Sequence, residues 1–306
     1  MINKMQAMNK KTFILVTFTL FNYQCSMESN KNKSFSNSSE EVVSIFADEP
    51  LKNSSLAKEN IKGKVRSIEE ADYNAITKFG EIQKGELRGK GTTFYNEKGN
   101  HIEAIGDLGN KVTYKYDEKG NEIEYHSYNS DGNLIEKGIN KYDENGYKIE
   151  SNQYKSDGSL SSKEKYKYDE IGNKTEENLY NSDGSLISKN TYKYDENGNE
   201  IEMTTFYSEG NEYNGITTFN YNDNGYRIEI NWTSLNGLMG NKTINKYDEQ
   251  GNEIEIRTIK YNGNFKEIDN YMRKYEYDKM GNWVKVIYFQ VESPSFIQER
   301  KIEYYP

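Results

Sequence analysis

The stretch YDENGYKIE, residues 142–150, decides the fold, because it returns with small changes along most of the chain. Related phrases begin at Tyr95, Tyr116, Tyr168, Tyr194, Tyr221, Tyr247 and Tyr277, and between the middle copies the spacing is 26 or 27 residues. Self-similarity at a fixed period is the signature of a repeat architecture. A second phrase, YNSDGNLIE at Tyr128 and its relatives at Tyr154 and Tyr180, falls between the copies, so each repeat contains two turn signals.

Each phrase carries the chemistry of a tight β-hairpin turn. An Asp or Asn opens the turn, and its side chain can accept a hydrogen bond from the backbone two residues on. A Gly follows three residues later, where a type I turn with a bulge needs a left-handed backbone and a Cβ would clash. The Asp–Gly pairs that we assign to these turns are Asp117/Gly120, Asp143/Gly146, Asp169/Gly172, Asp195/Gly198 and Asp248/Gly251.

Between the turns lie seven to ten residues with strand character. About 14 turns predict an all-β domain, an antiparallel up-and-down meander of about 15 strands built from 26-residue double hairpins. The YDxxGN turns are expected at one edge and the YNSDGS turns at the other. Gly63–Ala75 is predicted to form the first strand, with an edge blunted by charge. An open sheet that curls is the favoured form, because the terminal segments depart from the repeat as caps do; a closed barrel is the alternative.

A period of two assigns the faces of each strand. In the segment 122–128, Ile123, Tyr125 and Ser127 share one face, and Glu122, Glu124, His126 and Tyr128 share the other. The sheet is expected to curl around its Ile/Tyr face, giving a thin core. His101 and His126, the only two histidines, are expected to be solvated.

The N-terminal segment predicts export. Three lysines precede an apolar run of ten residues, TFILVTFTLF at 12–21, which is too short to span a bilayer but suits a signal peptide. The only cysteine, Cys25, follows closely and resembles the lipidated cysteine of a bacterial lipoprotein. An ordinary secretory signal or an uncleaved anchor is the alternative. We therefore predict a signal peptide at 1–24, a lipid-anchored flexible tether at 25–62 and a repeat domain at 63–306, in the cell envelope and at the outer membrane.

The repeated Tyr-Asp-x-x-Gly-Asn phrase resembles the YD repeat of Rhs-like proteins, and the lipoprotein signal and composition resemble small repeat lipoproteins of Bacteroidetes-type bacteria. The resemblance implies a curling β-sheet. The usual Arg after the glycine is Asn in most copies, and no toxin domain follows, so toxin delivery is not implied.

Composition limits the function classes. The formal net charge is −9 in 306 residues, which removes the electrostatic basis for general nucleic-acid binding. No HExxH or GxSxG motif is present, so we predict no enzyme, no metal site and no cofactor. The expected function is a binding module that recognises a polymer or a protein at the cell surface through its Tyr-rich sheet, with the membrane as a partner through the lipid. Three alternatives stay open: a structural spacer, a carbohydrate or cell-wall binder, and calcium held by the acidic turns.

Overall fold

The computed structural model describes residues 54–306 apart from 211 and 264. The signal peptide, Cys25 and most of the predicted tether lie outside these residues. Among the described residues, no helix is long and apolar enough to cross a membrane. The single described helix, α2 (Ser55–Lys58), is one turn long and is capped by the Ser54 side chain, which accepts a hydrogen bond from the Ala57 backbone N–H.

Eighteen antiparallel strands form one sheet in which every strand pairs with its sequence neighbours. Their bounds are β1 Val65–Lys78, β2 Glu81–Tyr95, β3 His101–Gly106, β4 Lys111–Tyr116, β5 Glu122–Tyr128, β6 Leu134–Tyr142, β7 Lys148–Lys155, β8 Leu160–Tyr168, β9 Lys174–Asn181, β10 Leu186–Tyr194, β11 Glu200–Tyr207, β12 Gly215–Tyr221, β13 Arg227–Ser234, β14 Met239–Tyr247, β15 Glu253–Asn262, β16 Phe265–Tyr277, β17 Trp283–Gln290 and β18 Ser293–Tyr304.

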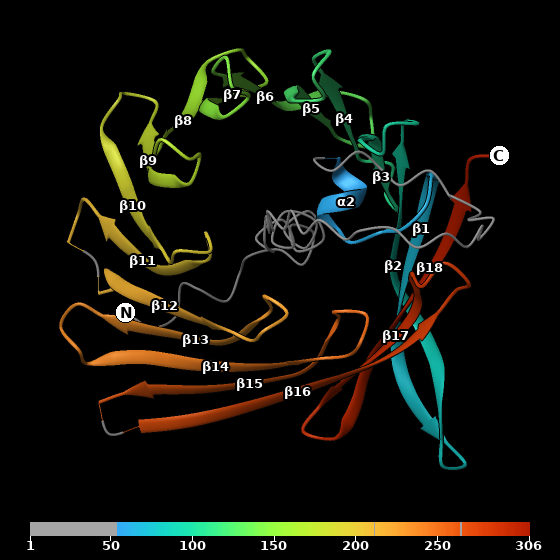
Figure 1. Ribbon diagram of the computed structural model, residues 1–306. Coiled ribbons are helices and arrows are strands. Elements are labelled where there is room, and N and C mark those ends of the chain that lie inside the picture. The colour runs from blue at the N-terminus through green and yellow to red at the C-terminus, as the bar shows by residue number, and fades with distance from the viewer. Residues whose placement is uncertain (1–53, 211, 264) are drawn as a thin grey trace, which may run out of the picture.

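The sheet closes into a barrel, so the prediction of an open curl with about 15 strands is wrong. β1 pairs with β2 on one side and with β18 on the other, over nine residue pairs from Val65↔Tyr304 to Asn74↔Phe296. The segment predicted to be a charged free edge is therefore an interior strand of the sheet. Figure 1 shows the resulting ring, with α2 inside it. Closure removes both edges and their unpaired backbone groups.

The turns follow the sequence pattern. In the repeat turn that begins at Asp169, the Gly172 N–H donates to the Asp169 carbonyl, the Asp169 N–H donates to the Asn173 carbonyl, and Gly172 has a φ of +95°. The Asp169 side chain also accepts hydrogen bonds from the backbone N–H groups of Ile171 and Asn173. Each such turn ends in a bulge that shifts the register by one residue, as between Lys167 and Tyr168.

These bulges change which side chains point inward. In β5 the register places Glu122 opposite Tyr116 and Glu124 opposite Lys115, so the two glutamates lie on different faces, although a strict period of two puts them together. The phrase tyrosines that precede the YDxxGN turns, such as Tyr116, Tyr142 and Tyr168, point into the barrel. The phrase isoleucines point out: Ile123 is 36% exposed, Ile149 40% and Ile201 38%, so the predicted Ile/Tyr core face is wrong.

The densest core lies where the barrel closes. Leu56 and Ile61 from the helical segment pack with Val65, Ile68 and Tyr95, and Ile302 and Tyr304 of β18 lie against them. The last residues of the predicted tether, 54–62, thus pack into the barrel. This segment is tied to three turns of the YDxxGN type: the Leu56 N–H donates to the Gly99 carbonyl, the Asn60 amide to the Gln250 carbonyl, and Lys62 exchanges two hydrogen bonds with the Asn282 side chain.

Candidate functional site

One backbone position recurs just after every YDxxGN-type turn, as the second residue beyond the glycine. We call these eight residues the lumenal belt: His101, Glu122, Lys148, Lys174, Glu200, Arg227, Glu253 and Trp283. The turn residues around them are nearly constant, whereas the belt residues differ widely in chemistry. Because the bulge turns this position inward, the belt lines the inside of the barrel beside that rim.

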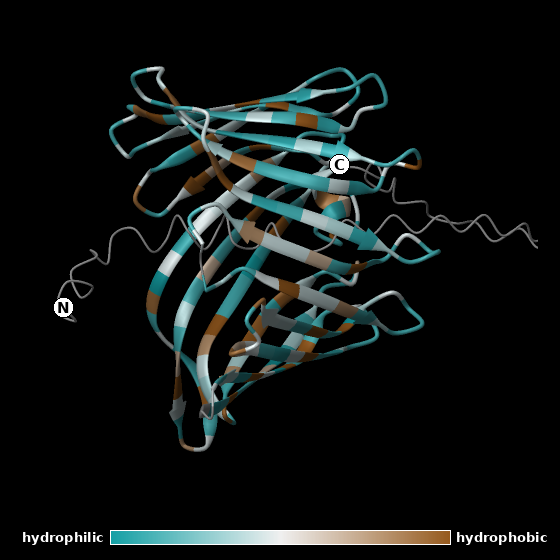
Figure 2. Cartoon of the chain, turned by 90° about the vertical axis from the view of Figure 1, so that its left-hand side faces the viewer, coloured by the Kyte–Doolittle hydropathy of each residue, from teal (hydrophilic) through white to brown (hydrophobic). Residues whose placement is uncertain are grey.

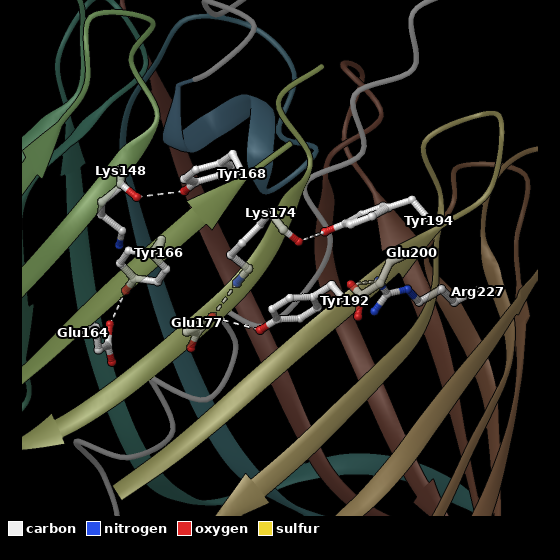
Figure 3. Close-up of polar contacts among 10 residues, drawn as sticks. All are labelled: Lys148, Glu164, Tyr166, Tyr168, Lys174, Glu177, Tyr192, Tyr194, Glu200 and Arg227. Atoms are coloured by element: carbon white, nitrogen blue, oxygen red, sulfur yellow. Dashed lines mark hydrogen bonds and ion pairs between the residues drawn. The ribbon is translucent and has the colours of Figure 1, made fainter. Parts of the chain in front are cut away.

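Tyrosine hydroxyls hold the backbone of the belt. The phrase tyrosine of the next hairpin donates to the carbonyl oxygen of the belt residue, over 2.9 Å from Tyr168 to Lys148 and 2.8 Å from Tyr194 to Lys174 (Figure 3). The same bond joins Tyr116 to His101, Tyr142 to Glu122, Tyr221 to Glu200 and Tyr247 to Arg227. Burial holds the pKa of Tyr168 at about 12, so it stays a neutral donor at physiological pH. These tyrosines therefore have a structural role.

Cations of the belt lie on aromatic rings. The Lys174 ammonium is 4.5 Å from the Tyr192 ring centroid and 2.5 Å from a Glu177 carboxylate oxygen. The Arg227 guanidinium carbon lies 4.2 Å from the Phe219 ring centroid, and its Nη2 is 3.0 Å from Glu200. Cation–aromatic contacts of this kind gain strength as water is removed. Figure 3 shows Lys148 of β7, Lys174 of β9 and Arg227 of β13, with Glu200 of β11 between the last two.

His101 stands apart from the other belt residues. Its Nε2 is buried without a hydrogen-bond partner, 3.6 Å from a Glu122 carboxylate oxygen, and its ring centroid is 4.1 Å from that of Tyr114. The prediction that His101 is solvated is wrong for this side chain. A buried polar atom without a hydrogen bond from the protein is a point where a ligand or a water molecule can bind.

The predicted turn residues lie elsewhere, in the turns of one rim. There each aspartate carboxylate accepts a hydrogen bond from the backbone N–H four residues on, at Asp117, Asp143, Asp169, Asp195 and Asp248. Desolvation opposes ionisation of Asp195, but hydrogen bonds from Asn199 and Asn197 outweigh it and lower the pKa of this carboxyl. Among the described residues, no group of three or more His, Cys, Asp or Glu side chains is placed to hold a metal ion.

The predicted turn glycines share one backbone conformation but differ in their surroundings. Left-handed φ values of +82° to +95° occur at Gly120, Gly146, Gly172, Gly198 and Gly251. A Cβ would clash with a tyrosine side chain only at Gly172, against Tyr147, and at Gly251, against Tyr226. At Gly120, Gly146 and Gly198 the nearest side-chain atom lies 3.7 to 3.9 Å from an added Cβ, so the left-handed backbone alone disfavours a side chain at these positions. None of the five glycines belongs to the belt, so they form its scaffold.

The belt itself was not predicted as a site. Its signal, a single variable position within an otherwise constant phrase, is nevertheless present in the sequence. Counting the second residue beyond each turn glycine finds all eight members. The inward direction of these side chains could not be predicted in the same way. A strict period of two assigns them to the outer face, because it ignores the bulge after each turn.

The outer wall differs in character from the lumen. Lysine–glutamate pairs repeat across it at Lys115–Glu124, Lys141–Glu150, Lys167–Glu176, Lys193–Glu202 and Lys246–Glu255, with N–O distances of 2.7 to 2.9 Å. The lysine side chains of these pairs are 61–69% exposed. Figure 2 shows hydrophilic and intermediate residues over most of these strands, with hydrophobic ones scattered among them.

No protein-family model matches the sequence, and no curated protein does. Among solved structures, the chain is similar to a porin-like protein from Bacteroides uniformis, with 11% identity, 78% of this chain and 96% of that one covered, and a TM-score of 0.42. A porin-like protein from Bacteroides vulgatus gives 12% identity, coverage of 79% and 98%, and a TM-score of 0.35. The Photorhabdus luminescens Tc holotoxin pore gives 13% identity over 72% of this chain, but only 16% of that chain, with a TM-score of 0.20.

The assignment to the Rhs-like YD-repeat family is therefore wrong. The resemblance implied an open curling β-sheet, whereas the described strands close into a single 18-stranded ring. At these identities and TM-scores, the likeness says nothing about ligands or transport.

Proposed function

We propose that the protein is a binding module of the bacterial cell envelope and that it holds a polar ligand against the lumenal belt. The observation that carries this proposal is the contrast between copies of the repeat: in six of them the same tyrosine bond fixes the backbone of the belt position, while its side chain changes between His, Glu, Lys and Arg. A purely structural position would favour the same residue in each copy, as the turn glycines do.

The chemistry of the belt indicates the ligand class. Barrels of 16 to 18 strands leave a water-filled lumen. Around this lumen, carboxylates at Glu122, Glu200 and Glu253 are interspersed with the cations of Lys148, Lys174 and Arg227, and tyrosine rings lie between them. Such a wall suits a ligand with groups of both charges and flat apolar faces. Peptide-linked sugars of the cell wall have these features, and they are the ligands that we expect.

The outer wall supports a barrel that lies outside the hydrocarbon of a membrane. A membrane barrel carries an outward apolar band about 25 Å tall, and charged residues in that band are destabilising. Here exposed lysine–glutamate pairs lie on the outer face near the YDxxGN turns, where each lysine is the last residue but one of its strand. Strands β3 to β13 have six to nine residues, at or below the roughly 9–11 that span a bilayer. Attachment to the outer membrane would then come from lipid on Cys25.

An exchange of charges tests the belt. Glu200→Arg combined with Arg227→Glu retains the ion pair but reverses its polarity, so the fold should survive. Binding of soluble peptidoglycan fragments, measured by calorimetry, should weaken about tenfold or more, as expected for misplaced charges at an interface. The matched control is Lys246→Glu with Glu255→Lys, an exposed pair on the outer wall. Equal affinity of the belt exchange and the control would contradict the proposal.

A spacer is the second candidate, and one observation favours it: several belt charges already have a partner, as in Arg227–Glu200 and Arg273–Glu253. A wall whose charges are satisfied internally would make a stiff rod without any ligand. Absence of binding by the unchanged protein, together with an unaltered belt-exchange variant, is the result that this candidate predicts.

The anchor has its own test. Cys25→Ala should move the protein from the membrane fraction to the aqueous fraction and abolish labelling with radioactive palmitate. A protein that stays in the membrane fraction after this substitution would contradict lipid attachment at Cys25, while leaving the belt proposal intact.

A further inference from the structure

A second periodic feature lies on the outer wall, near the rim formed by the YNSDGS turns. Aromatic side chains recur there every 26 residues, and each stands directly opposite a lysine of the preceding strand. The pairs are Lys111↔Tyr128, Lys137↔Tyr154, Lys163↔Tyr180 and Lys189↔Phe206. We call these eight residues the aromatic–lysine row. It runs across strands β4 to β11 on the face opposite to the belt.

The contacts show lysines lying over the rings. The ammonium nitrogens of Lys111 and Lys137 are 5.7 and 5.9 Å from the ring centroids of Tyr128 and Tyr154, and Lys165 lies 5.9 Å from that of Tyr180. On the other side of each tyrosine stands a leucine of the same hairpin: Tyr128↔Leu134, Tyr154↔Leu160 and Tyr180↔Leu186. Phe206, at the end of the row, is 45% exposed. Each repeat of the row thus places an apolar surface, formed by a tyrosine ring and a leucine, beside a lysine ammonium group.

This part of the wall is richer in cations than the protein as a whole, which carries −9. Two lysines flank a single glutamate: Glu150 is 2.9 Å from Lys141 and 3.7 Å from Lys163, and Glu176 is 2.9 Å from Lys167 and 2.6 Å from Lys189. Hydrogen bonds from Asn152 and Lys141 lower the pKa of Glu150 to about 2, and those from Lys189 and Lys167 do the same for Glu176. At both glutamates the lysines on the strand wall therefore outnumber the carboxylate that they flank.

The surface is hollowed within the row. A shallow pocket of about 340 Å³ is lined by Leu160, Lys163, Lys165, Tyr180 and the turn residues 181–184. It thus joins one leucine, one tyrosine and two lysines on strands β8 and β9 with the carboxylate of Asp183 in the turn. The corresponding aromatic residues on either side are two strands away, which is about 10 Å.

We propose that the aromatic–lysine row binds an acidic polysaccharide, with sugar rings on the Tyr128, Tyr154 and Tyr180 faces and uronate carboxylates at the lysines. The tyrosine–lysine pairs recur on every second strand. This spacing suits a polymer in which a sugar ring and a carboxylate recur with every disaccharide. Several shallow contacts then act together, so that weak single sites give useful affinity. This site is independent of the lumenal belt.

The test uses the purified full chain and polygalacturonate as the probe, with neutral dextran as the reference polymer. The unchanged protein should bind polygalacturonate, and binding should weaken as salt is raised. The triple variant Tyr128→Ala, Tyr154→Ala, Tyr180→Ala should reduce affinity about tenfold or more, while the triple Tyr→Phe variant, which retains the rings, should bind like the unchanged protein. The matched control is Tyr261→Ala with Tyr271→Ala, two exposed tyrosines elsewhere.

Three results would overturn the proposal: no binding of polygalacturonate, equal loss in the control variant, or preference for polyglutamate, which would indicate an acidic peptide as the partner. Circular dichroism of each variant verifies that the barrel has formed. The belt-exchange variant, Glu200→Arg with Arg227→Glu, leaves the row unchanged and should bind polygalacturonate like the unchanged protein. Its binding therefore distinguishes a failure of the row proposal from a failure of the belt proposal.

Discussion

The tyrosine hydroxyls join one hairpin to the next at the scale of single residues. Tyr168 donates to the carbonyl of Lys148, the first residue of the preceding strand β7, which follows the previous YDxxGN turn. Tyr168→Phe removes this donor and leaves the carbonyl without it, at a cost of about 1–2 kcal/mol in the free energy of unfolding. The control is Tyr180→Phe, on the outer wall, where the change should be within about 0.5 kcal/mol. Urea unfolding of the two variants measures the difference; equal stability would contradict the structural role of Tyr168.

A buried carboxyl group beside α2 makes stability depend on pH. Burial raises the pKa of Glu59, against the opposing charges of Arg300 and His101, and the Tyr95 hydroxyl lies 3.4 Å from the carboxylate. A carboxyl group with a raised pKa in the folded state binds its proton more tightly there than in the unfolded chain. Its contribution is fully present below the unfolded pKa, near 4.5, and is lost as the pH rises through the folded value.

Glu59→Gln removes this dependence, because the amide is neutral at every pH. The variant should melt a few degrees higher than the unchanged protein at pH 7, and the two should converge near pH 4. Thermal melts followed by circular dichroism at the two pH values give the comparison. A variant that is less stable at pH 7 would show that the ionised Glu59 is compensated by Arg300.

At the scale of hairpins, the turn glycines differ in what surrounds them. A Cβ on Gly172 would clash with the Tyr147 ring, which stacks on Tyr168 with centroids 4.9 Å apart, whereas a Cβ on Gly184 would meet nothing within 4 Å. Both glycines have positive φ, at 95° and 88°. Gly184→Val should therefore cost roughly 1–2 kcal/mol from backbone strain alone. Gly172→Val should cost about 2–4 kcal/mol, since the ring stack is lost as well.

Chemical denaturation of these two variants makes a matched comparison, because the substitution and the backbone conformation are the same. Equal losses would mean that the Tyr147–Tyr168 stack adds nothing. A Gly172→Val variant as stable as the unchanged protein would contradict the left-handed turn itself.

The hairpins were predictable from sequence because their signals are local. Asp169 and Gly172 specify a turn within four residues, and the period of 26 follows from counting. The bulge after each turn was foreseen, but not its effect on the faces, and so Glu122 was placed on the same side as Glu124. That single shift hid the belt, since its side chains are charged and a charged residue in a strand is expected to face water.

Closure of the barrel depends on the whole molecule and is not written in any one repeat. The strands that seal it, β1, β2, β17 and β18, are the least repetitive in sequence, which made them resemble caps. In the structure they contain the best-buried side chains: Val65 and Val286 are fully buried, and Ile297 and Ile68 are 1% and 3% exposed. The strands that depart from the repeat therefore form the seam of the barrel, the region where β1 pairs with β18. There a denser apolar core takes the place of the tyrosine hydrogen bonds.

Truncation after Glu202 tests closure. It removes β12 to β18, which includes the β18 partner of β1 and the residues Val286, Ile297 and Ile302. In an open sheet such a fragment would still unfold cooperatively with lower stability. In the closed barrel it exposes two edges and loses half of the seam, so we expect no cooperative transition in urea. Adding the complementary fragment, residues 203–306, should restore the transition, because the cut at β11 and the β1–β18 seam can both be paired again. A fragment 1–202 that melts cooperatively by itself would show that closure is not needed for folding.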